Sequence, residues 1–140
     1  MLRVLVCDDD AGTRLLLKRI LSRDHGALVT EAADGQRAVE LLAASEFDLL
    51  VLDLMMPGLD GVGVLKALRA QPAFASLPVV VLSSERRAES ISQVIQLGVS
   101  EFLLKPLHQE STSARLRAAV QRITDATAAR PSPDSAHQQA

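Results

Sequence analysis

Three consecutive carboxylates, Asp8, Asp9 and Asp10, directly follow the first apolar run of the chain. Two carboxylates about 4 Å apart repel each other by roughly 4 kcal/mol at an effective dielectric constant near 20, so a cluster beside a core needs a partner. Later apolar runs also end in polar residues, namely Asp53, Ser83 with Ser84, and Lys105 before Pro106. Carboxylates without a His or Cys ligand make an oxygen-only site that suits Mg²⁺. A hydroxyl and an ammonium opposite the cation can hold a phosphoryl group, and an Asp can itself be the nucleophile that forms an aspartyl-phosphate.

The elements that must position these residues are short strands separated by helices. Continuous apolar runs, typical of strands buried on both faces, occur at Arg3–Cys7, Ala27–Glu31, Phe47–Leu52, Pro78–Leu82 and Glu101–Leu104. Segments with helical spacing of apolar residues follow at 11–22, 34–45, 61–71, 88–98 and 109–124. This alternation predicts an α/β fold, a doubly wound parallel sheet of five strands with helices on both faces.

In such a sheet, ligands bind at the carboxyl ends of the strands, near the point where the strand order reverses. The polar residues come from four different runs, so parallel strands bring them to one edge although they are far apart in sequence. A cation bound there would relieve the repulsion between Asp8, Asp9 and Asp53. Asp10 is better placed as the N-cap of the first helix, a position that favours Asp.

Four segments resemble one known family. "VLVCDDD", "DLLVLDLMMPGLDG", "VVVLSSE" and "EFLLKPL" match, in order and spacing, the motifs of the receiver domain of two-component response regulators, the CheY-like family, over about Leu2 to Asp125. The resemblance implies a flavodoxin-like strand order 2-1-3-4-5. It also implies that Asp53 is the phosphoacceptor, which takes a phosphoryl group from the phosphohistidine of a sensor histidine kinase or phosphotransfer protein.

The same resemblance implies the ligands of an Mg²⁺ cofactor. Asp9 and Asp53 are expected to bind the ion directly, the main-chain carbonyl of Met55 to supply a third ligand, and Asp8 to act through a water molecule. Positions two beyond Asp53 and Ser83, occupied by Met55 and Glu85, should flank the path of a hydrolytic water. Met offers no strong hydrogen-bonding group to orient that water, so we expect slow self-dephosphorylation.

The resemblance further assigns the groups that contact and sense the phosphoryl group. Ser83 and Lys105 are expected to contact its oxygens, and Phe102 matches the aromatic residue that turns inward on activation. Lys105–Pro106 matches a peptide bond that is cis in the family. Ser83 stands where Thr is commoner, and Phe102 carries no phenol hydroxyl.

The amino-acid composition limits the kinds of partner that the chain can bind. The chain of 140 residues has a net charge of −2, three Phe and no Trp or Tyr, which argues against direct nucleic-acid binding and against membrane attraction. The lone Cys7 excludes an internal disulfide, and the chain shows no signal peptide or membrane span, so we expect a cytoplasmic protein. Residues 126–140, with two Pro and no periodicity, are expected to be a disordered tail, or a linker to a missing output domain, after a receiver domain of residues 1–125.

Three functions fit these residues to different degrees. The first is a phosphoryl-accepting switch that signals to a downstream effector protein or output domain. Such a protein catalyses only its own phosphotransfer and self-dephosphorylation. A weak dimer contact is expected through its fourth helix, fifth strand and fifth helix. The second is an Mg²⁺-dependent phosphatase of the haloacid dehalogenase class, whose nucleophile belongs on the first strand. The third is a degenerate receiver used only for docking, against which the complete set of Asp9, Asp53, Ser83 and Lys105 argues.

Overall fold

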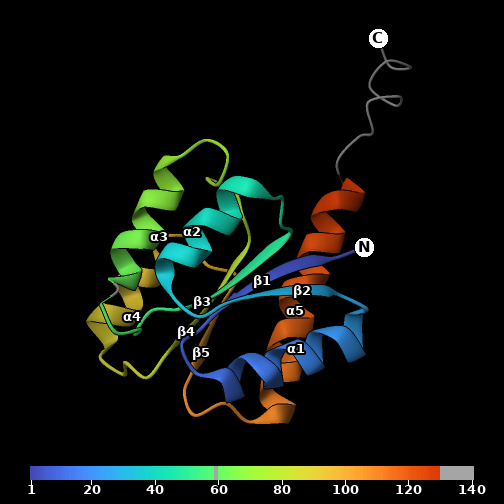
Figure 1. Ribbon diagram of the computed structural model, residues 1–140, viewed down its shortest axis with the longest axis horizontal. Helices are drawn as coiled ribbons and strands as arrows, with labels where there is room; N and C mark the ends of the chain where they lie inside the picture. The colour runs from blue at the N-terminus through green and yellow to red at the C-terminus, as the bar shows by residue number, and fades with distance from the viewer. Residues whose placement is uncertain (59, 130–140) are drawn as a thin grey trace.

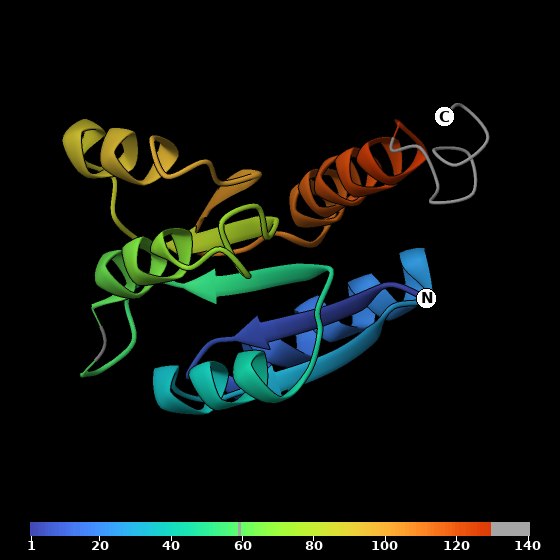
Figure 2. The ribbon, with the colours of Figure 1, turned by 90° about the horizontal axis from the view of Figure 1, so that it is seen from above.

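The computed structural model describes residues 1–58 and 60–129. Strands and helices alternate along the chain (Figure 1): β1 (Arg3–Cys7), α1 (Ala11–His25), β2 (Leu28–Ala32), α2 (Gly35–Ala44), β3 (Leu49–Asp53), α3 (Gly61–Ala70), β4 (Val79–Ser83), α4 (Ala88–Ile95), β5 (Glu101–Leu104) and α5 (Gln109–Ala129). The sheet has the order β2-β1-β3-β4-β5, and all neighbouring strands are parallel. The arrows of β1 and β3 point the same way in Figure 2. The predicted fold class and strand order are therefore confirmed.

Each face of the sheet is covered by its own set of helices. Along β1, Leu5 and Cys7 pack with buried residues of α2, α3 and α4, whereas Val4 and Val6 pack with those of α1 and α5. Figure 1 shows α1 and α5 on one side of the sheet and α2 and α3 on the other. Successive side chains of a strand point to opposite faces, so a strand covered on both faces is apolar at every position. This explains the continuous apolar runs of the sequence.

Three strands begin later than predicted. β2 and β4 are each shifted by one residue, and β3 begins at Leu49 rather than at Phe47. The regular pairing of β1 with β3 begins at Val4 and Leu49, and the preceding residue Asp48 joins β1 only through its main-chain N–H, which bonds to the carbonyl oxygen of Arg3 at 2.8 Å. β3 and β4 also end one residue later than predicted, so Asp53 and Ser83 are the last residues of their strands and not the first residues after them.

Aspartates set the start of three helices on this scaffold. Each side chain accepts a hydrogen bond from a main-chain N–H three residues later, which satisfies one of the free donors at a helix start. The pairs are Asp10 with Thr13, Asp34 with Arg37, and Asp60 with Gly63. The N-cap role predicted for Asp10 is confirmed.

The last helix extends beyond the predicted domain boundary. α5 continues to Ala129, so residues 126–129, predicted to belong to a disordered tail, are helical. The segment Ala126-Thr127-Ala128-Ala129 contains no Gly or Pro, and Ala is the best helix former, so helix propensity prevails there. The rest of the predicted tail, residues 130–140, lies outside the described residues. Within residues 1–58 and 60–129, no helix is both long enough and apolar enough to cross a bilayer.

Candidate functional site

The predicted acids meet at the carboxyl edge of the sheet. Asp8, Asp9 and Asp53 each offer a carboxylate oxygen, and these oxygens lie within 4.8 Å of one another. Asp8 follows β1 and Asp53 ends the adjacent parallel strand β3, which explains why residues 45 positions apart in sequence become neighbours. The side chains of Asp8 and Asp53 are buried, and Asp9 is exposed. Three carboxylates with only oxygen donors form a group that could hold a hard divalent cation.

Asp10 stands apart from this cluster. Its carboxylate accepts hydrogen bonds from the main-chain N–H of Thr13 at 2.9 Å and from the Thr13 hydroxyl at 2.7 Å. These bonds lower the pKa of Asp10 below its ordinary value. The side chain is therefore committed to the start of α1, and only its main-chain N–H reaches the cluster, donating to Asp8 Oδ1 at 2.8 Å.

Lys105 brings its ammonium between the two buried acids. Its Nζ lies 2.8 Å from Asp8 Oδ2 and 3.0 Å from Asp53 Oδ2. Burial alone would lower the pKa of Lys105, but its bonds with Asp8 and Asp53 outweigh burial and raise it. Lys105 is followed by the predicted cis peptide bond to Pro106.

The negative charge of the Asp8 carboxylate is not fully compensated by its neighbours. Burial raises the pKa of Asp8, and the stabilising contacts with Lys105 and the Asp10 N–H do not cancel that effect. The contact of Asp8 Oδ2 with Lys105 is a close ion pair without the alignment of a hydrogen bond, and that oxygen has no hydrogen-bond partner. A buried carboxylate oxygen with spare lone pairs fits a site that receives a further positive charge.

The remaining predicted residues surround Asp53. Its Oδ1 accepts a hydrogen bond from the main-chain N–H of Met55 at 2.9 Å. Ser83 ends the neighbouring strand β4 and is buried; its Oγ accepts a bond from the N–H of Glu85 at 3.0 Å. Ser83, Glu85, Met55 and Phe102 all contribute to the lining of one cavity of about 220 Å³. The structure thus brings Lys105 into ionic contact with Asp8 and Asp53, with Asp9 close to both acids, and places the predicted switch residues Ser83 and Phe102 on the cavity that Met55 also lines.

Two sets of contacts were missed from sequence. Arg14 of α1 donates through Nη1 to the carbonyl oxygen of Asp8 at 2.8 Å and pairs with Glu31 of β2 at 3.2 Å, so it fastens the loop that carries the acids. Glu85 is held by Arg87, with 3.0 Å between Oε2 and Nη2, and this lowers the pKa of Glu85 to about 2. Arg14 is four residues beyond Asp10 in sequence, one helical turn, which is the signal that could have revealed it.

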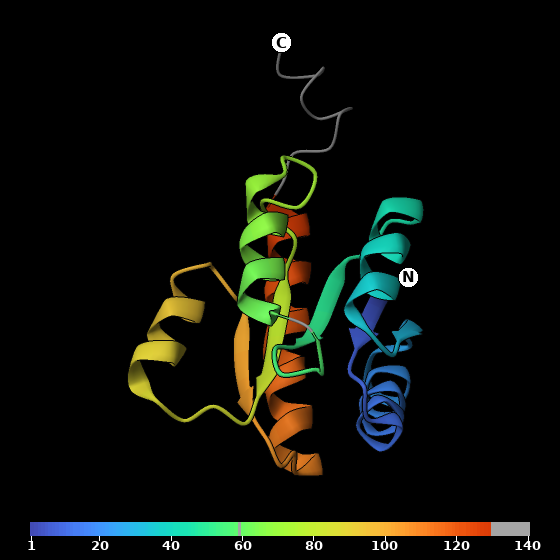
Figure 3. The same ribbon diagram turned by 60° about the vertical axis from the view of Figure 1, so that its left-hand side comes forward.

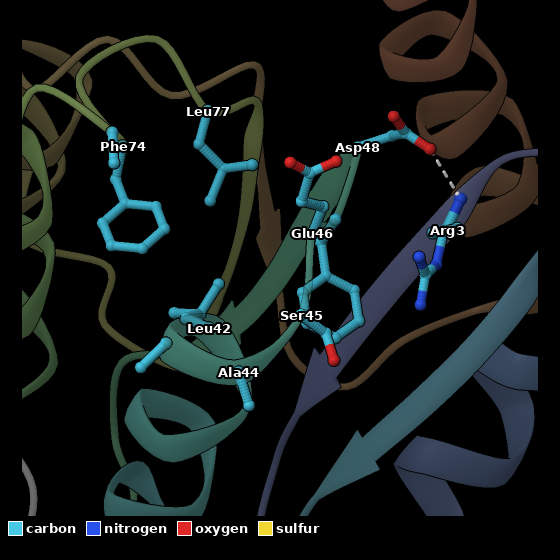
Figure 4. A pocket seen from close by; sticks show the side chains of 11 residues that line it. Arg3, Leu42, Ala44, Ser45, Glu46, Asp48, Phe74 and Leu77 are labelled. Carbon is cyan, nitrogen blue, oxygen red and sulfur yellow. Dashed lines mark hydrogen bonds between the residues drawn. The ribbon is translucent and has the colours of Figure 1, made fainter.

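A separate hollow of about 770 Å³ lies at the opposite, amino-terminal edge of the sheet (Figure 4). Its lining includes the apolar side chains of Leu42, Phe74 and Leu77, and Asp48 there accepts a hydrogen bond from the main-chain N–H of Arg3 at 2.8 Å. The lining of this hollow contains none of the clustered acids, Ser83 or Lys105, so it contributes nothing to their chemistry.

Comparison with known proteins agrees with this geometry. Residues 4–117 match the family described as the response regulator receiver domain. The chemotaxis protein CheY of Pseudomonas aeruginosa is 32% identical over 123 residues, which cover 87% of this chain and 98% of that protein. The response regulator MprA of Mycolicibacterium vanbaalenii is 38% identical over 122 residues, covering 87% of this chain and 52% of MprA, so this chain spans about half of MprA. The solved structure of the non-phosphorylated HemR receiver domain from Leptospira biflexa superposes with a TM-score of 0.78 at 29% identity, covering 86% of this chain and 94% of that one.

The parallel α/β sheet with an acid cluster and a lysine at its carboxyl edge agrees with this family, whose known role is phosphorylation-dependent signalling. The chain belongs to the family of response regulator receiver domains and is CheY-like. Its role is that of the family, two-component signal transduction.

Proposed function

We propose that Asp53 is the residue that accepts the phosphoryl group. One observation carries the proposal: the Asp53 carboxylate lies at the end of the central strand, buried, with the Lys105 ammonium at 3.0 Å and two further acids within 4.8 Å. Phosphoryl transfer depends mainly on positioning and on neutralising charge, and this arrangement supplies both.

In the proposed reaction, a carboxylate oxygen of Asp53 forms a bond to phosphorus while the bond from phosphorus to the phosphohistidine nitrogen of the donor breaks. The imidazole of the donor histidine leaves and takes up a proton. Lys105, already beside Asp53, then pairs with a phosphoryl oxygen. Because Ser83 Oγ accepts its hydrogen bond from Glu85, the hydroxyl proton stays available to be donated to another phosphoryl oxygen.

The acid cluster fits Mg²⁺ by its donor set and by the buried Asp8, whose charge the contact with Lys105 does not fully compensate. We assign Asp9, Asp53 and the carbonyl oxygen of Met55 as direct ligands and Asp8 as a ligand through water. When bound, the ion would neutralise negative charge on the phosphoryl oxygens.

Phosphorylation is proposed to alter an interaction surface. Capture of the Ser83 hydroxyl would leave space for Phe102 to turn inward, since both side chains line the same cavity. The surface of α4, β5 and α5 would then change its affinity for a downstream effector or an output domain, or form a weak dimer. The chain is proposed to act in the cytoplasm as a signalling protein that catalyses only its own phosphotransfer and dephosphorylation, with residues 126–140 leading toward any output domain.

The test is phosphorylation by a small donor. With acetyl phosphate and Mg²⁺, the intact mass should rise by one phosphoryl group, and Asp53→Asn or excess EDTA should abolish the rise. Asp48→Asn is a matched control, because Asp48 is an exposed acid at the other edge of the sheet and should leave labelling unchanged. Absence of labelling in the parent protein would favour the docking-only alternative.

A further inference from the structure

Helix α4 starts without the usual side-chain cap. Arg87 occupies the N-cap position and makes no capping hydrogen bond through its own side chain. Glu85 holds this residue instead: its Oε1 accepts from the Arg87 main-chain N–H at 2.8 Å and from Nε at 3.1 Å, while Oε2 lies 3.0 Å from Nη2. A carboxylate that accepts two parallel bonds from a guanidinium is held in a defined geometry. The beginning of α4 therefore depends on the Glu85–Arg87 pair.

The same pair is tied to the phosphoacceptor site. The main-chain N–H of Glu85 donates to Ser83 Oγ at 3.0 Å, and Ser83 is almost completely buried at the end of β4. Ser83, Glu85 and Arg87 thus form a continuous series of hydrogen bonds from the site to the first turn of α4. The cavity of about 220 Å³ beside this series also reaches Ser90 and Val94, so space is available next to the helix.

A partly buried arginine holds the residues directly after the other end of α4. Arg69 of α3 donates to the carbonyl oxygens of Leu97 at 2.8 Å and Gly98 at 3.2 Å, directly after α4, and to those of Phe74 and Leu77 at 2.9 and 2.7 Å. Burial lowers the pKa of Arg69. The one fully buried side chain of α4, Val94, lies in its last turn. Figure 3 shows α4 at the margin of the molecule, and no side chain in its amino-terminal half is fully buried.

We propose that Glu85 and Arg87 are positioning residues that latch the first turn of α4 to Ser83, and that Arg69 fixes the pivot about which α4 moves when the latch opens. This inference rests on the proposed function, because the opening event is capture of the Ser83 hydroxyl by a phosphoryl group on Asp53. Ser83 Oγ moves toward the phosphoryl oxygen to which it donates, and this movement breaks the bond that Oγ accepts from the Glu85 N–H. The pair with Arg87 then loses its anchor, and the first turn of α4 is released. The last turn stays in place because Arg69 does not contact the site.

The first experiment uses the unmodified chain. Amide hydrogen exchange is measured with and without beryllofluoride, a phosphoryl mimic, whose binding is followed independently by ¹⁹F NMR. The Ile91 N–H, which bonds to the Arg87 carbonyl, should exchange about tenfold faster with the mimic, as expected for local opening. The N–H groups of Gln96 and Gly98, bonded to Ser92 and Ile95, should change by less than about twofold. Bound mimic with an equal change along the whole of α4 would overturn the pivot.

Variants test the latch itself. Arg87→Ala should speed amide exchange at Ile91 before any mimic is added and should reduce the further effect of the mimic. Arg87→Lys should restore only part of the protection, because Lys keeps the positive charge but cannot make the two parallel bonds. Arg37→Ala is the control: it breaks another Arg–Glu pair, on α2, far from α4 in sequence, and should leave Ile91 unchanged. Equal exchange at Ile91 in Arg87→Ala and the parent would overturn the latch.

A substitution of Arg69 tests whether this residue holds the last turn of α4 in place. Arg69→Met should let exchange at Gln96 and Gly98 respond to the mimic, and Arg69→Lys serves if that variant does not fold. No response at these amides in a folded Arg69 variant with bound mimic would contradict the pivot. Failure of the mimic to bind in the parent protein would count against the proposed function and not against the latch alone.

Discussion

Replacing Asp8 by Asn should stabilise the protein when no divalent cation is present. The substitution keeps the shape of the side chain and the oxygen that accepts from the Asp10 N–H, but removes a fully buried negative charge. Lys105 keeps its contact with Asp53 at 3.0 Å, so its ammonium remains paired. The variant therefore isolates what the charge of Asp8 costs the folded state.

The magnitude follows from the distances. At an effective dielectric constant of 20, Asp8 repels Asp53 by about 3.5 kcal/mol or more, since their carboxylate oxygens lie within 4.8 Å, and attracts Lys105 by about 6 kcal/mol at 2.8 Å. The exposed Asp9 adds repulsion of only about 1 kcal/mol, because water screens it. These contributions nearly cancel, so the cost of burying the charge, several kcal/mol for an ion, decides the sign. We expect Asp8→Asn to raise the free energy of unfolding by about 1–2 kcal/mol at pH 7.

The assay is urea unfolding in EDTA, with Asp10→Asn as the control, since Asn caps a helix as well as Asp. The raised pKa of Asp8 means that the folded state holds a proton more tightly than the unfolded chain. As the pH rises through the raised pKa of Asp8, the free energy of unfolding of the parent falls, whereas that of Asp8→Asn does not. The variant should therefore be more stable than the parent at pH 7, and this difference should shrink as the pH falls through that pKa. A less stable variant at pH 7, or an advantage that grows on acidification, would refute this account.

Three further predictions concern single side chains. Met55→Asn should shorten the lifetime of the phosphorylated form about tenfold, because the new amide can orient the attacking water; a tenfold change corresponds to about 1.4 kcal/mol of activation barrier. Single-turnover loss of the phosphoryl label in Mg²⁺ buffer measures the rate, and an equal or slower rate in the variant would count against this role of Met55. Asp9→Asn should weaken Mg²⁺ binding, followed by calorimetry, about tenfold or more, whereas Asp10→Asn should leave it unchanged; the reverse order would contradict the ligand assignment. Hydrogen bonds from Arg23 and Ser113 lower the pKa of Asp24 to about 2, so Ser113→Ala should raise that pKa. NMR titration of the Asp24 carboxyl measures it, and an unchanged pKa would contradict the role of Ser113.

Periodicity and strand-end residues were sufficient to predict the sheet and the meeting of its acids. Asp8, Asp53 and Lys105 end or follow different strands, and parallel pairing alone brings such residues to one edge. The cap of Asp10 was predictable because its partner lies three residues away, within the reach of a local rule.

Features that depend on packing between distant elements were not predictable. The direct contact of the buried Asp8 with Lys105 arises because the Lys105 side chain, directly after the edge strand β5, reaches past β4 to the ends of β1 and β3; sequence reasoning gave Asp8 only a role through water. Val39 of α2 is 52% exposed, whereas Ala38 and Leu42 of the same helix are buried. Arg69 satisfies carbonyl groups from two loops whose positions no local pattern specifies.

The central claim is that Asp53 carries the phosphoryl group, and chemical mapping of the modified residue tests it most directly. The protein is phosphorylated with acetyl phosphate and Mg²⁺, the aspartyl-phosphate is reduced with borohydride to homoserine, and the peptide is sequenced by mass spectrometry. The account predicts homoserine at position 53 alone. Homoserine at position 9, or at neither position in protein that has gained a phosphoryl group, would contradict it.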